Sequence, residues 1–184
     1  MNSNDFINYT NRLNSAFIKV DQISIEKVLF MLNQSFELGA RIWIAGNGGS
    51  AATASHFATD LSRCKNSNDK PIKGISLCDN SGLITAISND FGYEYIFSRQ
   101  LSNLATSGDL LIVLSASGNS KNILEVLGWA KNNQVKTIAL TGFDGGEANK
   151  MADISIHIPT EIGDYGVVED AHSVICHFLS SQFK

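Results

Sequence analysis

Hydrophobic residues along the chain gather in five short runs, separated by longer segments with helical periodicity. The runs are rich in β-branched residues and nearly continuous in apolar character, as is typical of strands that are buried on both faces of a parallel sheet. They are RIWIAG at 41–46, IKGISL at 72–77, LLIVLS at 110–115, KTIALT at 136–141 and ISIHI at 154–158. Crossover helices fit between them. The pattern predicts an α/β fold with a doubly wound parallel sheet.

Helical periodicity also marks both ends of the chain. Residues 1–38 precede the first strand and are predicted to form two helices, because Ile25, Leu29 and Leu32 recur at helical spacing together with Val28 and Phe36. A terminal helix is predicted over about 165–182, with an apolar stripe made of Val167, Val168, Ala171, Val174, Ile175, Phe178 and Leu179. The clearest loops are NDKP at 68–71 and FDGGE at 143–147.

The chain has 184 residues, a length that fits one domain. We expect that domain to span residues 1–184, with the leading helices over 1–38 and an α/β core that includes the terminal helix over 39–184. A net charge of −4 offers no broad attraction for nucleic acid or for an anionic membrane. No signal-peptide run or membrane span is visible, and the three cysteines lack CxxC spacing. These features predict a cytoplasmic protein with no nucleic-acid or membrane partner.

Two of the predicted strands run directly into polar turns. The strand at 41–46 is followed by NGGS and an alanine-rich segment, so Ser50 is expected at or near a helix N-cap. The strand at 110–115 is followed by a turn in which Ser115, Ser117 and Ser120 surround another helix N-terminus. In open α/β sheets, ligands bind beyond the carboxyl ends of strands, where helix N-termini offer free N–H groups. The turns predict a site for a phosphorylated small molecule, or else they serve only as tight turns and caps.

Histidine and acidic residues recur near these turns. His56 and Asp60 lie four residues apart and so share one face of the helix predicted after the first turn. Glu169 and His177 fall in the terminal helix. Three interpretations stay open: a His and carboxylate metal site of the kind zinc accepts, a metal-free acid–base pair, and a surface ion pair beside a core histidine. His157 and His172 are assigned no chemistry.

The spacing of Glu169 and His177 limits how they can share an ion. Eight residues rise about 12 Å along a straight helix, whereas zinc–ligand bonds are about 2 Å long. One helix can supply both ligands only with strain or an irregularity. We therefore hypothesise that the site combines chains, with the terminal helix of one subunit against the phosphate turn of another.

Four motifs in this order, GNGGSAA with HF after it, ISNDFGYEYIFSRQ, LSASGNSKNI and LTGFDGGE, resemble the SIS (sugar isomerase) family. The resemblance runs from about residue 5 to the C-terminus and includes His177. It implies a flavodoxin-like parallel sheet of five strands and a homotetramer with active sites between subunits. It also implies an aldose–ketose isomerisation of sedoheptulose 7-phosphate to D-glycero-D-manno-heptose 7-phosphate, toward the heptose of lipopolysaccharide or capsule.

The same resemblance implies roles for individual residues. The catalytic acid–base pair would be Asp60 and His177. One zinc ion per subunit would be held by His56, Asp60, Glu169 and His177. The substrate-binding residues would be Asn47, Gly48, Gly49, Ser50, Asp60, Asn89, Asp90, Ser115, Ala116, Ser117, Ser120 and Glu169, with the serine turn holding the phosphate.

In such a reaction a base removes the C1 proton of the ketose to give an enediolate, and reprotonation at C2 gives the aldose. Asp60 is the expected base and His177 the expected acid, with zinc as a Lewis acid. A carboxylate bound tightly to zinc is a poorer base, so the role of Asp60 stays open between base and ligand.

The chain departs from the family pattern at three positions: Asp60 stands where Glu is usual, Glu169 where Gln is typical, and Ala116 where Thr is frequent. These departures keep an isomerase for a related phosphosugar as an alternative. A second alternative is a non-catalytic SIS protein that binds a replication initiator. The presence of Asp60 and His177 favours an enzyme, because that binding protein lacks both groups.

Overall fold

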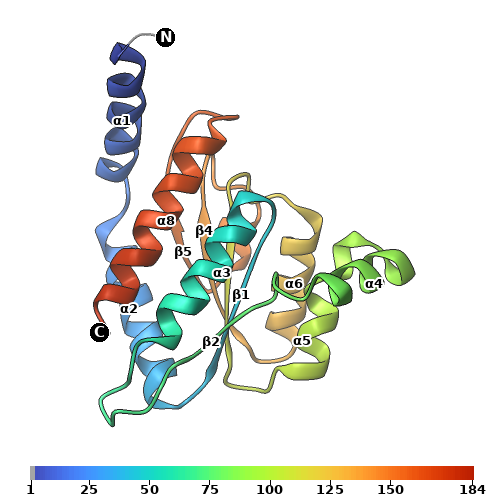
Figure 1. The fold of residues 1–184 in the computed structure, drawn as a ribbon. Helices are drawn as coiled ribbons and strands as arrows, with labels where there is room; N and C mark the ends of the chain where they lie inside the picture. Colours follow the sequence, from blue (N-terminus) through green and yellow to red (C-terminus); the bar gives the residue numbers. More distant parts are fainter. Residues whose placement is uncertain (1–2) are drawn as a thin grey trace.

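The computed structural model describes residues 3–184 (Figure 1). Two helices lead the chain, α1 (Ser3–Ile18) and α2 (Gln22–Glu37), as predicted. Strands and helices then follow in the order β1 (Arg41–Gly46), α3 (Gly49–Ser62), β2 (Lys73–Ser76), α4 (Ser81–Phe91), the 3₁₀ helix η1 (Tyr93–Tyr95), α5 (Ser98–Leu104), β3 (Leu110–Ser115), α6 (Lys121–Asn132), β4 (Lys136–Thr141), α7 (Ala148–Met151), β5 (Ile154–His157) and α8 (Tyr165–Ser181).

The five strands form one parallel sheet in the order β2-β1-β3-β4-β5. This order confirms the doubly wound prediction. The central strands β1, β3 and β4 have the predicted bounds, whereas the edge strands β2 and β5 are shorter than the apolar runs that predicted them. The chain winds in opposite directions from β1 and from β3. Ligands of such sheets bind at this switch point, beyond the carboxyl ends of the two strands.

Each face of the sheet is covered by its own hydrophobic layer, because successive strand residues point to opposite faces. On one face, α2, α3 and α8 pack against Ile42, Ile44 and Ile112. On the other, α5 and α6 pack against Trp43, Leu111 and Val113. Figure 1 shows the two sets of helices on opposite sides of the strands. Among the described residues, no helix combines the length and apolar character that crossing a membrane requires.

The terminal helix α8 covers the first of these faces with a narrower stripe than predicted. Val167, Val168 and Ala171 are buried, as are Ile175 and Leu179. The inclusion of Val174 and Phe178 in the predicted stripe is wrong, because their exposed fractions are 47% and 43%. These two residues lie four apart, on a neighbouring face of the helix that the sheet does not cover.

The first helix, α1, is joined to the body by Ala16, Leu13 and Phe17, which pack in the core, and by polar contacts with the start of α8. The Tyr9 hydroxyl donates to Asp170 Oδ2 at 2.6 Å, and Arg12 Nη1 donates to Asp164 Oδ2 at 2.7 Å. The hydrogen bond to Asp170 raises the pKa of Tyr9 to about 12. Beyond these contacts α1 projects past the sheet (Figure 1), and it leaves Phe6 and Ile18 72% and 77% exposed.

The buried titratable groups of α8 include a histidine. His172 is completely buried, and its ring lies beside the backbone of Thr141 at the end of β4. Burial lowers the pKa of His172 to about 4, because the interior does not solvate an imidazolium ion. The folded protein therefore holds this histidine in its neutral form at ordinary pH.

The neutral state of His172 makes the free energy of unfolding depend on pH. Its folded pKa of about 4 lies below the 6.5 of an unperturbed histidine, so the unfolded chain takes up the proton first as the pH falls. We expect this contribution to be complete above about pH 6.5 and to fall by about 3 kcal/mol as the pH approaches 4. Urea unfolding of the wild type and of His172→Leu across this range measures the effect. The matched control is His157→Gln, which should keep the wild-type pH dependence; equal losses in the wild type and His172→Leu would contradict the prediction.

Candidate functional site

The turn between β3 and α6 presents serine hydroxyls at a helix N-terminus. Ser115 ends β3, and Ser120 is the N-cap of α6, with a hydroxyl that makes no capping hydrogen bond. Gly118 has a φ of +64°, a left-handed conformation that favours glycine. Its N–H donates to the Ser115 side chain at 3.1 Å, and the N–H of Asn119 donates to Ser117 Oγ at 3.2 Å. These hydrogen bonds hold the Ser115 and Ser117 side chains near the N-terminus of α6.

A neighbouring loop, the predicted FDGGE loop, supports this turn from behind. The N–H of Ala148 donates to the carbonyl of Gly118 at 2.9 Å, and the N–H of Glu147 donates to Asn119 Oδ1 at 3.0 Å. A Cβ atom on Gly118 would collide with the carbonyl oxygen of Gly145. Backbone therefore packs directly on backbone, and a side chain at 118 would separate the two loops.

The turn between β1 and α3 forms the other wall. The N-cap of α3 is Gly48, with a φ of +55°, and no side chain caps the helix. Ser50 is therefore not the cap, although it lies two residues beyond it and is buried. The first N–H groups of α3 therefore have no side-chain cap and can donate to a ligand.

A pair of asparagines joins the two turns, and sequence reasoning missed half of it. Asn47 Nδ2 donates to Asn122 Oδ1 at 2.9 Å, and Asn122 Nδ2 donates back to Asn47 Oδ1 at 2.8 Å. The Tyr93 hydroxyl donates to the same Asn47 Oδ1 at 3.0 Å. Asn122 is only 2% exposed. No local pattern could identify Asn122 or Tyr93, because their partner lies 75 or 46 residues away in the chain.

Between the two turns lies a cavity of about 120 Å³. Its walls are Asn47, Ser50, Leu114, Ser115, Ala116, Ser117, Ser120, Tyr165 and Glu169. No Lys, Arg or His is among these lining residues. The Glu169 carboxylate comes from α8 and lies against the first residue of α3, so that a Cβ atom on Gly49 would collide with it. The structure thus brings most of the predicted substrate residues to one cavity, which we call the serine cavity.

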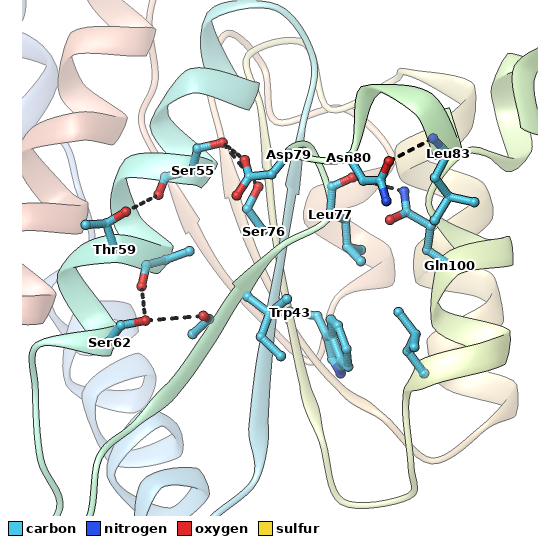
Figure 2. Close-up of a pocket in the computed structure, with 14 residues that line it drawn as sticks. Trp43, Ser55, Thr59, Ser62, Ser76, Leu77, Asp79, Asn80, Leu83 and Gln100 are labelled. Atoms are coloured by element: carbon cyan, nitrogen blue, oxygen red, sulfur yellow. Dashed lines mark hydrogen bonds between the residues drawn. The ribbon is translucent and has the colours of Figure 1, made fainter. Parts of the chain in front are cut away.

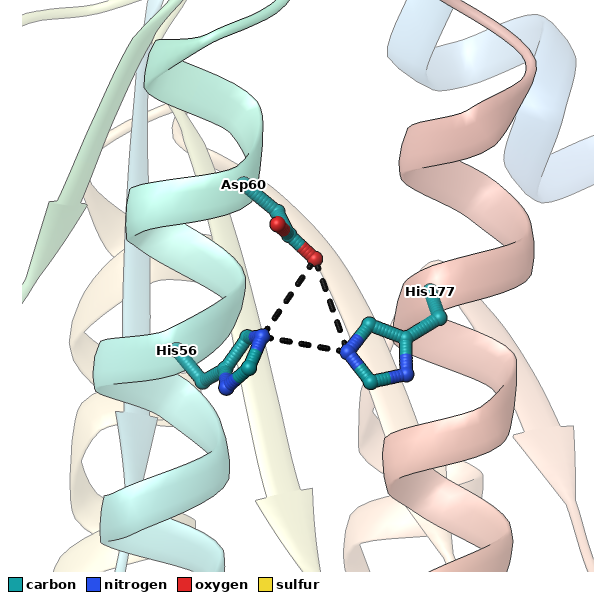
Figure 3. A group of neighbouring side chains, drawn as sticks. All are labelled: His56, Asp60 and His177. Atoms are coloured by element: carbon teal, nitrogen blue, oxygen red, sulfur yellow. Dashed lines mark hydrogen bonds and ion pairs between the residues drawn. The ribbon is translucent and has the colours of Figure 1, made fainter.

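A second group of predicted residues meets where α8 crosses α3 (Figure 3). His56 and Asp60 come from α3, and His177 comes from α8. Asp60 Oδ2 lies 3.7 Å from each histidine Nε2, and the two Nε2 atoms lie 3.1 Å apart. Asp60 is buried, with 7% exposed, whereas the side chains of His56 and His177 are 61% and 52% exposed. The Ser180 hydroxyl also donates to Asp60 Oδ2, at 3.5 Å.

The spacing of these three donor atoms fits a metal ion. Tetrahedral zinc with bonds of about 2.0–2.2 Å places its ligand atoms about 3.3–3.5 Å apart. The observed separations of 3.1 and 3.7 Å bracket that value. The 3.1 Å contact between the two Nε2 atoms fits a hydrogen bond between the imidazoles as well as shared coordination of one cation. The group can therefore hold a transition-metal ion or relay a proton.

The remaining predicted ligand, Glu169, is not part of this group. It lines the serine cavity, eight residues before His177 and about 12 Å away along α8. The predicted separation of the two residues thus agrees with the structure. The hypothesis that another subunit must supply the terminal helix is not needed for His177, because α8 of the same chain packs along α3. Within its own chain Glu169 lines the serine cavity, and its role as a fourth ligand stays a prediction.

Two other predicted substrate residues, Asn89 and Asp90, lie apart from the serine cavity. Both are exposed on α4, where Asn89 Nδ2 donates to Asp90 Oδ1 at 2.9 Å. Neither lines the cavity. Within one chain, the structure does not bring this pair to the polar turns.

A larger cavity, of about 550 Å³, lies over β2 between α3 and the α4–α5 region (Figure 2). No predicted site residue lines it. Its polar side chains are already engaged: Ser55 donates to Asp79, Ser62 to the carbonyl of Ala58, and Gln100 to the carbonyls of Leu77 and Ile96. In the serine cavity, by contrast, the Ser120 hydroxyl makes no capping hydrogen bond to α6, so it can bind a ligand. The serine cavity is therefore the better candidate site.

Comparison with known proteins identifies relatives of this chain and of its fold. The SIS domain model matches residues 5–142. A phosphoheptose isomerase from Campylobacter concisus is 40% identical over 156 residues, which make up 85% of this chain and 82% of that protein. The solved structure of a phosphoheptose isomerase from Francisella tularensis has a TM-score of 0.88 and 30% identity, over 98% of this chain and 97% of that chain. That of phosphoheptose isomerase GmhA from Neisseria gonorrhoeae has a TM-score of 0.86 and 27% identity, over 98% and 95%.

Proposed function

The chain belongs to the SIS domain family, and from this premise we propose that it is a phosphoheptose isomerase. It converts sedoheptulose 7-phosphate into D-glycero-D-manno-heptose 7-phosphate for heptose biosynthesis. The observation that carries the proposal is that one helix, α8, borders both a phosphate-sized cavity and a buried carboxylate flanked by two histidines. Glu169 at the cavity and His177 at the carboxylate are about 12 Å apart along α8, on the scale of an extended seven-carbon sugar phosphate.

The serine cavity holds the phosphate through neutral donors. The hydroxyls of Ser115, Ser117 and Ser120, together with the N-terminal N–H groups of α6, can donate to its oxygens, and the positive end of the helix dipole stabilises its charge. Glu169 in the same cavity is an acceptor only. It suits the sugar hydroxyls next to the phosphate, because a carboxylate accepts their hydrogen bonds.

Asp60 and His177 transfer the protons. Asp60 takes the proton from C1 of the open-chain ketose and returns it at C2, so that the carbonyl moves from C2 to C1. Over the same steps the oxygens exchange a proton: O2 gains one and O1 loses one. His177 is half-exposed beside Asp60 and can carry that proton when its Nε2 is not bound to an ion, since imidazole both donates and accepts protons.

We propose that zinc is the ion held by His56, Asp60 and His177, one ion per chain. Their nitrogen and oxygen donors are the types zinc prefers, and their spacing fits. When bound, zinc would act as a Lewis acid toward the carbonyl and enediolate oxygens. His56 and His177 would then be neutral, with Nε2 as the coordinating atom of each.

We also propose a homotetramer with active sites between subunits. Asn89 and Asp90 are exposed on α4 and away from the serine cavity of their own chain, so their predicted sugar contacts require a neighbouring copy. Exposed apolar side chains on α1 and α2, such as Phe6 and Phe30, supply surface that an oligomer would bury. The cytoplasmic location and the choice between lipopolysaccharide and capsule heptose stay predictions.

Removal of either proton-transfer group should abolish most of the turnover. We expect Asp60→Asn and His177→Ala each to lower kcat about 10²- to 10⁴-fold, because each loses an acid–base group while the fold is kept. A coupled assay of sedoheptulose 7-phosphate conversion measures this. The matched control is Asp69→Asn, a change in an exposed loop that pairs with Lys65. Wild-type protein that is folded but inactive, or Asp60→Asn with full activity, would contradict the proposal.

Zinc binding can be measured without turnover, by competition with a chromophoric chelator on metal-free protein. We expect His56→Ala and His177→Ala to weaken zinc binding at least about tenfold, which corresponds to 1.4 kcal/mol. Glu169→Gln and the control His157→Ala should leave the affinity close to that of the wild type, because neither residue belongs to the donor group. Equal losses in Glu169→Gln and His177→Ala would support the four-ligand set predicted from the sequence instead.

Mixing inactive variants tests the shared active site. If Asp90 of one chain serves the site of another, then Asp90→Ala and His177→Ala chains refolded together should recover about a quarter of the wild-type activity, through sites that receive both intact residues. Asp60→Asn mixed with His177→Ala is the control, since both residues belong to the same chain's site and no intact site can form. Recovery in neither mixture would contradict the interfacial arrangement.

A further inference from the structure

Tyr165, the first residue of α8, is part of the serine cavity. The other hydroxyl groups of the cavity come from the turns after β1 and β3, whereas Tyr165 approaches from α8. It lies one helical turn from Glu169, on the same face of the helix. A group bound in the cavity would therefore meet residues of α8 as well as those of the two turns.

The ring of Tyr165 is held by an aromatic partner. Phe143 meets it edge to face, with ring centroids 5.0 Å apart and planes at 81°. This is the geometry that aromatic pairs prefer. Phe143 is itself buried against Ala116 and Val168, and Ala116 is another residue of the cavity wall. The orientation of the Tyr165 ring is therefore set before any ligand arrives.

Phe143 adopts a conformation that few residues of its type adopt. Its φ is +48°, in the left-handed region that a bulky side chain rarely enters. Three hydrogen bonds keep it there. Its N–H donates to Thr160 Oγ1 at 3.1 Å, and its carbonyl accepts from His157 Nε2 at 3.1 Å and from the N–H of Thr160 at 3.4 Å. Strain that is maintained in this way beside a cavity points to a function for the ring it positions.

The chemistry of the cavity indicates what Tyr165 binds. The cavity is lined without Lys, Arg or His, so a phosphate there depends on neutral donors. A phenol supplies one O–H donor, and the Tyr165 hydroxyl has no hydrogen-bond partner among the residues that the structure describes. Its side chain is 55% exposed, so the ring also stands between the cavity and solvent.

We propose that Tyr165 is a substrate-binding residue of the serine cavity, which donates a hydrogen bond to the phosphate and limits the cavity to a group of that size. Phe143 is the positioning residue that holds the ring. The proposal rests on the proposed function for its sugar phosphate, but the phosphate contact itself does not depend on turnover.

Calorimetric titration with inorganic phosphate is the first test. We expect the wild type to bind phosphate, Tyr165→Phe to bind it about tenfold more weakly because one donor to a charged group is lost, and Phe143→Leu to weaken it by a smaller factor. The matched control Tyr95→Phe loses a hydroxyl that does not line the cavity and should bind phosphate as the wild type does. No phosphate binding by the wild type, or equal binding by the wild type and Tyr165→Phe, would overturn the inference.

Kinetics with sedoheptulose 7-phosphate separate this inference from the proposed function. Tyr165→Phe should raise KM about tenfold and leave kcat close to the wild-type value, because the phosphate contact is the same in the ground state and the transition state. A fall in kcat with unchanged KM would overturn the binding role. Wild type that binds phosphate but does not turn over the sugar would refute the isomerase and leave the Tyr165 contact standing.

Discussion

The contact on which the site depends is the packing of α8 along α3. It is an apolar contact: Ala54, Phe57 and Leu61 of α3 are buried in the same core as Ala171 and Ile175 of α8. Polar groups lie along its edges, where Cys64 Sγ approaches the carbonyl of Ser180 at 3.4 Å and Ser180 Oγ approaches Asp60. Burial, together with the nearby Asp60 charge, raises the pKa of Cys176, so this thiol stays protonated within the contact.

This contact brings together two groups of polar side chains at different positions along the same pair of helices. At the N-terminal end of α3, the absence of a side chain on Gly49 lets the Glu169 carboxylate approach the helix backbone. Farther along, the same two helices bring His56, Asp60 and His177 together. A change that shifts α8 by one turn, about 5.4 Å, would separate both sets at once. The serine cavity and the group of His56, Asp60 and His177 are therefore spaced by one helix rather than by two loops.

Much of this arrangement could be predicted from the sequence, because it depends on local patterns. Apolar runs specified the three central strands to the residue, and the polar turns after β1 and β3 identified both walls of the serine cavity. What could not be predicted were contacts between distant residues. The reciprocal pair of Asn47 and Asn122, the Tyr93 hydroxyl and the aromatic pair beneath Tyr165 have no local signature. The position of Glu169 against Gly49 could not be predicted for the same reason, because the two residues are far apart in the chain.

The same packing bears on how one carboxylate could be both a ligand and a base. Each interaction that Asp60 makes with His56, His177 and Ser180 uses the same oxygen, Oδ2. Among the described residues, none bonds to Oδ1. The carboxylate thus has one oxygen directed at the histidines and another that the proposed base function could use. An ion bound through Oδ2 would lower the basicity of the Asp60 carboxylate. The same ion would polarise the neighbouring carbonyl and make the C1 proton of the substrate more acidic. The pKa of the base and the pKa of the C1 proton would therefore fall together. Aspartate is one methylene shorter than glutamate and holds its carboxylate close to α3, so the proposed proton transfer requires the substrate carbon to approach that helix closely.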